Sequence, residues 1–136
     1  MNIKFLGTKV SKLSLLVDVG NELELKDDFK LSFINKYSEE DENSFVVAFS
    51  LSISSEEEDF VLELEYLGFF STDEPISEDF KESHFPSMNA PAIAYPFLRS
   101  FINTVTVNSN LNPVILPTIN FQELVRQKKE ADKLTS

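Results

Sequence analysis

The sequence predicts an α+β domain in which a four-stranded antiparallel sheet carries two helices packed on one face. In the first half, four segments alternate apolar and polar residues with the period of two that half-buried strands show. Short acidic turns separate the later segments, and strands joined in this way are most simply antiparallel neighbours. The second half changes to a helical period. With 136 residues, the chain is the size of one domain, spanning residues 1–136.

The four predicted strands cover residues 6–19, 29–37, 44–54 and 60–67. The third is the clearest, because Phe45, Val47 and Phe49 alternate with small or polar residues. Gly68 is predicted to end the fourth strand, since an isolated glycine in a strand pattern often marks a bulge or a bend. The outer face of the sheet is predicted to be polar and to carry Lys12, Ser14, Ser50, Ser52, Glu63 and Glu65.

Residues 71–87 are acidic and contain prolines, so they are predicted to form a connection with at most one helical turn. An apolar helix follows. Its predicted core-facing stripe joins two rows, Ile93, Phe97, Phe101 and Val105 in one and Ala94, Leu98 and Ile102 in the other, with Tyr95, Arg99, Asn103 and Thr106 on the opposite side. Pro96 cannot donate a backbone hydrogen bond, so the helix is predicted either to begin near Tyr95 or to bend there.

A long apolar loop with two prolines leads to a second helix. Asn120 and Glu123 have the spacing of an N-cap residue and the third helical residue, which places the helix start at Phe121. Phe121, Leu124 and Val125 are predicted to be buried, ahead of a charged end beyond Arg126.

Composition excludes several partners. A net charge of -11 and a pI near 4.4 argue against binding to nucleic acid or to anionic membranes. The chain has no cysteine, hence no disulfide or thiolate metal site. It lacks an apolar run of the ~20 residues that a membrane span needs. We expect a protein without direct membrane insertion that stays in the cytoplasm.

Catalytic patterns are poor, so the sequence predicts neither an enzyme nor a cofactor. His84 is the one histidine and lies in a predicted loop, so a nucleophilic triad has little support. The three glycines are too scattered for a phosphate-binding loop. The acidic runs lack the ligand alternation of a calcium loop, and no metal site is predicted.

Residues 88–121 carry a resemblance to a known family. Pro91, Pro96 and Pro117, with the pairs Leu111-Asn112 and Asn120-Phe121, resemble the SecB family of export chaperones over about a quarter of the chain. A weaker likeness runs back through Phe60-Val61-Leu62-Glu63 and Gly68-Phe69-Phe70-Ser71. The first half is similar in pattern alone.

The resemblance implies a cytoplasmic, ATP-independent holdase that keeps secretory precursors or other unfolded polypeptides competent for export. It also implies a homotetramer, a dimer of dimers whose subunits meet through the first strand and the long helix. By position, the wall of the client-binding groove would include Leu23, Leu25, Phe29, Phe121, Leu124 and Val125. The alternative is that these residues are ordinary core residues.

The family also implies docking to the motor SecA through the outer face of the sheet, here at Val61 and Glu63. Lys12, however, stands at or beside the position of an acidic docking residue, which reverses its charge. This favours a second hypothesis, a dedicated SecB-like chaperone of an antitoxin in a toxin–antitoxin system. A third hypothesis is a structural or adaptor protein that has kept the fold without binding clients.

Overall fold

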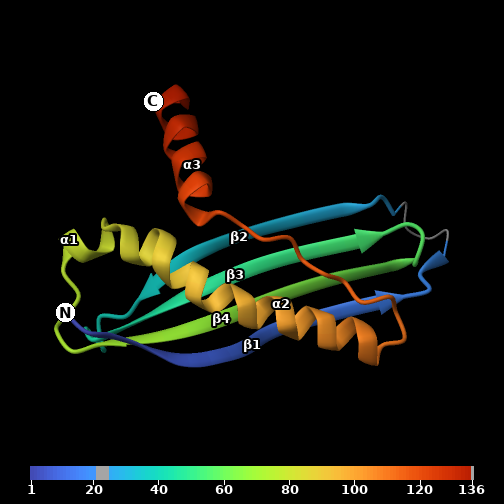
Figure 1. The fold of residues 1–136 in the computed structure, drawn as a ribbon, viewed down its shortest axis with the longest axis horizontal. Coiled ribbons are helices and arrows are strands. Elements are labelled where there is room, and N and C mark those ends of the chain that lie inside the picture. The colour runs from blue at the N-terminus through green and yellow to red at the C-terminus, as the bar shows by residue number, and fades with distance from the viewer. Residues whose placement is uncertain (21–24, 136) are drawn as a thin grey trace.

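A computed structural model describes residues 1–20 and 25–135. It contains four strands followed by helices: β1 (Ile3–Val17), β2 (Asp28–Tyr37), β3 (Ser44–Ser55), β4 (Phe60–Thr72), α1 (Glu78–Lys81), the π-helical turn η2 (Phe85–Asn89), α2 (Ala90–Asn108) and α3 (Phe121–Thr135). The strands form one antiparallel sheet in the order β1-β4-β3-β2 (Figure 1). The predicted fold class is therefore confirmed, and β1 and β2 are the two edge strands.

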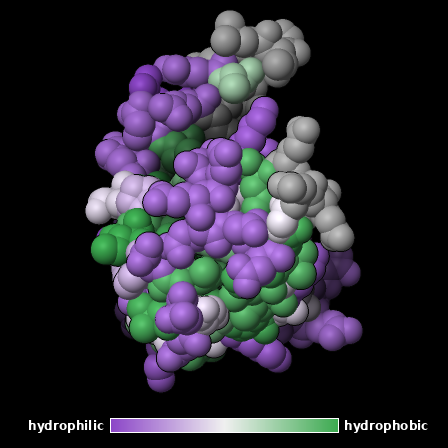
Figure 2. Space-filling view, turned by 90° about the vertical axis from the view of Figure 1, so that its right-hand side faces the viewer, coloured by the Kyte–Doolittle hydropathy of each residue, from purple (hydrophilic) through white to green (hydrophobic). Residues whose placement is uncertain are grey.

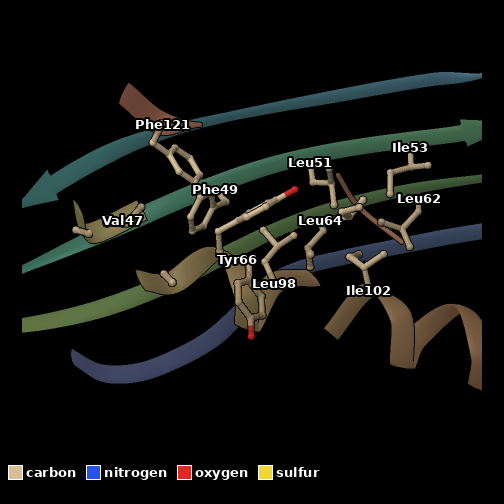
Figure 3. Packing of buried hydrophobic residues seen from close by; sticks show 14 of the residues in the cluster. Val47, Phe49, Leu51, Ile53, Leu62, Leu64, Tyr66, Leu98, Ile102 and Phe121 are labelled. Carbon is tan, nitrogen blue, oxygen red and sulfur yellow. The ribbon is translucent and has the colours of Figure 1, made fainter. Parts of the chain in front are cut away.

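The core lies between the central strands and α2, which crosses one face of the sheet (Figure 1). Alternation along β3 and β4 turns every second side chain toward the helix, as predicted. Leu98 and Ile102 of α2 point toward the sheet and are completely buried (Figure 3). Stacked and edge-to-face aromatic rings fill one end of the core, where Phe45 lies parallel to Phe70 with 5.0 Å between the ring centroids.

β4 continues past Gly68 to Thr72, so the predicted strand end was wrong. Gly68 serves helix packing instead. A Cβ atom at this position would lie 2.9 Å from the Cβ of Ala94 in α2, closer than two carbon atoms can pack. The missing side chain is what allows α2 to lie directly on the centre of the sheet.

β1 begins and ends earlier than predicted, and Val19 lies outside it. The strand stops because Asp18 adopts a left-handed backbone conformation, with φ of 58°, and its N–H donates to the carbonyl oxygen of Asp59 at 2.9 Å. This bond ties the end of β1 to the turn before β4.

α2 starts at Ala90 and runs through Pro96, so it does not begin near Tyr95. Its buried face is also rotated from the predicted stripe. Tyr95 and Thr106 are 4% and 0% exposed, whereas Ile93 and Phe97 are 40% and 49% exposed. Burial of the two polar residues is tolerated because their hydroxyl groups find backbone partners, as described below.

α3 begins at Phe121, as predicted. The side-chain oxygen of Asn120 accepts from the backbone N–H of Glu123 at 3.1 Å, which is the predicted N-cap bond. Phe121 is the one buried side chain among those described in this helix. From this first turn α3 projects away from the sheet, past the edge formed by β2 (Figure 1).

Candidate functional site

An apolar groove of about 790 Å³ lies between α3 and β2, and we call it the β2 groove. It is lined by Leu31, Ser32, Phe33, Ile34, Asn35, Ser87, Leu124, Val125, Gln127 and Lys129. Five of these residues are consecutive in β2. Because successive strand residues point to opposite faces, a groove that touches all five must run along the edge of the strand.

The edge of β2 that borders this groove is open. β2 pairs with β3 on its other side, and no second strand pairs with it among residues 1–20 and 25–135. Half of its backbone N–H and C=O groups therefore face the groove side without strand partners. Such an edge is a template for an added extended chain.

Phe121 fixes the base of α3 against the sheet. Its ring centroid lies 5.7 Å from that of Phe33 in β2 and 5.6 Å from that of Tyr95 in α2, both in edge-to-face geometry. Phe121 is 4% exposed, so its ring lies beneath the β2 groove rather than in its wall. One aromatic side chain thus links the two elements that border the groove to the central helix.

The loop before α3 is held by the two polar residues buried in α2. The hydroxyl of Tyr95 donates to the carbonyl oxygen of Pro117 at 2.7 Å. The hydroxyl of Thr106 donates to the carbonyl oxygen of Ile102 at 3.0 Å and accepts from the N–H of Val114 at 3.1 Å. Burial raises the pKa of Tyr95 above its usual value, while nearby Arg99 lowers it, so the phenol remains protonated and able to donate near neutral pH.

The far side of α3 is polar. Arg126 donates from Nε to Glu123 at 3.0 Å and from Nη1 to Glu130 at 2.8 Å. The hydrogen bond from Arg126 lowers the pKa of Glu123. Each pair spans about one helical turn, and the two pairs support a helix whose outer surface faces water.

The structure brings together some of the predicted groove residues and separates others. Leu124, 36% exposed, and Val125 line the β2 groove. Phe29, 39% exposed, lies at the start of β2 and Leu25 in the preceding loop, and neither lines the groove. The predicted residue Leu23 lies outside the described residues.

Sequence reasoning missed the middle of β2, which supplies half of the groove lining. Leu31, Phe33 and Asn35 occupy the face of β2 that pairs with the core-facing row of β3. The apolar alternation of β2 was recognised, but pattern alone does not show that this strand lies at a sheet edge beside the C-terminal helix.

The outer face of the sheet carries mixed charge where acidic docking residues were predicted. Val61 and Glu63 do lie on this face, opposite Ser54 and Ser52 of β3. Lys12 is the register partner of Glu65, and its Nζ lies 4.0 Å from Oε2 of Glu63. The two acidic residues therefore share their surface with a lysine.

The predicted polarity of the outer face holds for one half of the sheet and was wrong for the other. Toward the end where β4 finishes, the outward row contains half-buried Val46, Ala48, Leu67 and Phe69, with Ile34 on β2 58% exposed. The polar prediction rested on residues at the opposite end of the sheet, in the second halves of β1 and β3 and the first half of β4. The outward positions of β4 beyond Gly68 fell after the predicted strand end.

A second apolar surface lies on β1 and α2. Leu13 and Val17, on the helix-facing side of β1, are 43% and 39% exposed, and Val107 at the end of α2 is 50% exposed. Leu16, 51% exposed, lies on the outer face opposite Val61. Figure 2 shows apolar side chains gathered in the lower half of the view, which is the side of β1 and α2, below a hydrophilic band. Together with Ile93 and Phe97, these residues leave much of this side exposed in the part of the chain that the structure describes.

Residues that could support catalysis or metal binding do not gather in the described part of the chain. No cluster of three or more His, Asp or Glu side chains is arranged to hold a metal ion there. His84 is exposed at the start of η2. Among the described helices, none has the length and apolar character needed to cross a membrane.

Comparison with known proteins identifies the family. The family model described as preprotein translocase subunit SecB matches residues 19–132. An uncharacterised protein, MJ0357, of Methanocaldococcus jannaschii is 32% identical over 100 residues, covering 70% of this chain and 63% of that protein. The protein-export protein SecB of Roseobacter denitrificans is 31% identical over 104 residues, covering 68% of this chain and 61% of that protein. This chain thus spans about three fifths of the length of these relatives.

A solved structure shares the fold. The Rv1957 SecB-like chaperone of Mycobacterium tuberculosis, in complex with a ChAD peptide from the Rv1956 HigA1 antitoxin, matches with a TM-score of 0.67 and 14% identity over 86% of this chain and 90% of that one. The sheet order, the helix across the sheet and the match over residues 19–132 agree with one another. The chain belongs to the SecB family.

Proposed function

We propose that this chain is an ATP-independent holdase chaperone that binds unfolded or non-native polypeptides in the β2 groove. The observation that carries the proposal is an apolar groove of about 790 Å³ beside an open strand edge. An extended polypeptide can occupy both features, because its backbone can pair with the open edge of β2 while alternate side chains enter the apolar groove. The exposed apolar surface and net charge of -11 suit a protein that must stay in solution while it holds apolar clients.

The first candidate clients are secretory precursors, which the chaperone would keep competent for export. Support comes from the relatives named protein-export protein SecB and from the family model. The absence of cysteine fits work in the reducing cytoplasm, where precursors are made.

A second candidate client is the antitoxin of a toxin–antitoxin system. Lys12 beside Glu63 dilutes the acidic surface on which SecA docking would depend, and a protein of similar fold is solved with an antitoxin peptide. Under this proposal the same groove serves one dedicated partner, and docking to SecA through Val61 and Glu63 is not required.

Replacing Leu124 and Val125 together by serine should abolish most holdase activity. Both side chains line the β2 groove, and the loss of their apolar contact should weaken client binding about tenfold or more, because burying a side chain of this size is worth about 1.5–3 kcal/mol. The measurement is suppression of light scattering when a urea-denatured, unrelated protein is diluted into stoichiometric chaperone.

Ile115→Ser is the matched control for this experiment. Ile115 is 78% exposed in the loop before α3 and lies outside the β2 groove, so the variant should keep its activity. Equal activity of the double variant and the wild type would contradict the groove assignment. No suppression by the wild type for several clients would favour the adaptor hypothesis, and protection of one co-encoded partner alone would favour the dedicated chaperone.

We also propose that the chain assembles as a homotetramer, a dimer of dimers. The support is the open edge of β1 together with the exposed apolar residues of β1 and α2, which a second copy would cover. Light scattering at micromolar concentration should give four times the chain mass of 15.5 kDa. Phe97 is 49% exposed, and Phe97→Asp, which places a charge there, should reduce this mass. A monomeric wild type would contradict the proposal.

A further inference from the structure

Asn35 is a polar residue in an otherwise apolar row of the β2 groove. On β2 the preceding positions on the same face are Phe33 and Leu31, both in the groove lining. Asn35 is half-buried, and its register partner on β3 is the fully buried Val47. An apolar side chain would suit this environment better, so the presence of a polar amide at this position needs an explanation.

One half of the amide has a structural partner. Nδ2 of Asn35 donates to the carbonyl oxygen of Pro86 in η2 at 2.8 Å. Because a carbonyl oxygen accepts and cannot donate, this contact fixes the orientation of the amide, with nitrogen toward Pro86 and oxygen away from it. The π-helical turn that provides Pro86 also provides Ser87, another residue of the groove lining.

The oxygen half of the Asn35 amide has no hydrogen-bond partner among the described residues. Oδ1 of Asn35 is buried and receives no hydrogen bond from any group in the described part of the chain. Buried amide oxygens are nearly always paired, because losing water without gaining a donor is unfavourable. A residue of the groove lining therefore carries, just beneath the groove surface, a hydrogen-bond acceptor without a donor.

We infer that the bound polypeptide supplies this donor, and that Asn35 selects the register and sequence of client segments. This inference rests on the proposed function. In a strand added along the open edge of β2, the residue opposite Asn35 places its side chain on the same face, with Cβ atoms about 4.5–5.5 Å apart. A side chain with an N–H or O–H group at that position reaches Oδ1 once the bound segment displaces the side chains that cover this atom in the free chain.

The neighbouring positions define a pattern. Client residues opposite Phe33 and Leu31 meet apolar side chains, and they are two and four residues from the one opposite Asn35. The preferred segment is therefore extended and carries apolar, apolar and donor side chains at alternate positions. The preferred client is thus a polypeptide segment that is not uniformly apolar.

The test uses two short capped peptides and a double-mutant cycle on the full chain. In the host peptide, leucine alternates with serine or lysine. In its partner, one terminal leucine of the apolar row is replaced by asparagine, which has the same branching at Cγ. On the wild-type chain the asparagine peptide should bind at least as tightly as the host. On Asn35→Leu the host should gain about tenfold relative to the asparagine peptide, the effect of one buried hydrogen bond.

Asn43→Leu is the matched control variant. Nδ2 of Asn43 also donates to a backbone carbonyl oxygen, that of Thr72 at 3.2 Å, but Asn43 lies outside the β2 groove. This variant loses the same type of bond and should leave the ratio of the two peptide affinities as in the wild type.

Each outcome is decisive. An affinity ratio that is the same for the wild type and Asn35→Leu overturns the inference while leaving the groove in place, whereas no binding of either peptide to the wild type removes the proposed function itself. Should Asn35→Leu fail to fold, a scan of one asparagine through the apolar row of the host gives the answer on the wild type alone. One tolerated position supports the inference, and equal losses at all positions overturn it.

Discussion

Phe121→Ala should release α3 from the sheet and abolish client binding. The ring is 4% exposed and packs edge-to-face on Phe33 and Tyr95, and removal of a buried phenylalanine costs about 3–5 kcal/mol. No other described side chain of α3 is buried, so the loss should fall on this helix rather than on the whole fold. We expect amide hydrogen exchange to accelerate strongly in α3 and little in α2.

The contrast between the two helices makes this result interpretable. Equal acceleration in α2 and α3 would show that Phe121 stabilises the whole core, and the view of α3 as a separately attached element would then be wrong. Phe121→Leu, which retains much of the buried apolar surface, should recover most of the client affinity.

Gly68→Ala should destabilise the protein by about 1–3 kcal/mol, the usual cost of overpacking a core. The added methyl carbon would lie 2.9 Å from the Cβ of Ala94, so either α2 or β4 must move. Urea denaturation monitored by circular dichroism measures the change in the free energy of unfolding. A loss of this size is a substantial part of the total stability of about 5–15 kcal/mol that domains of this kind have.

A second substitution tests the cause. Gly68→Ala combined with Ala94→Gly removes the colliding methyl group and should recover part of the lost stability, although a glycine inside α2 itself costs about 1 kcal/mol relative to alanine. Strict additivity of the two single losses would contradict direct contact between these positions.

The parts of the fold that follow from local chemistry were predictable. The alternation in β3 and the N-cap pair Asn120 and Glu123 are determined by a few neighbouring residues, and both are found in the structure. The prediction for Gly68 was wrong because the role of this residue depends on a helix more than twenty positions away. In sequence, a glycine that allows close helix packing looks the same as a glycine that ends a strand.

The rotation of α2 and the composition of the groove share another cause. Tyr95 and Thr106 become buried because Pro117 and Val114, in the following loop, satisfy their hydroxyl groups. Periodicity assigns polar residues to the water side and cannot anticipate such partners. In the same way, the groove residues of β2 follow from strand order, which is a property of the sheet and not of any one segment.

The way in which α3 is attached bears on the energy source of the chaperone cycle. A wall whose one buried anchor is a ring at its first turn, with further contacts to η2, can swing out at the free energy of a local opening, below that of unfolding the sheet. Under the proposed function, thermal fluctuation then suffices to admit and discharge a client. Such a cycle needs no nucleotide, and it can accept segments of different bulk by a change in one hinge angle.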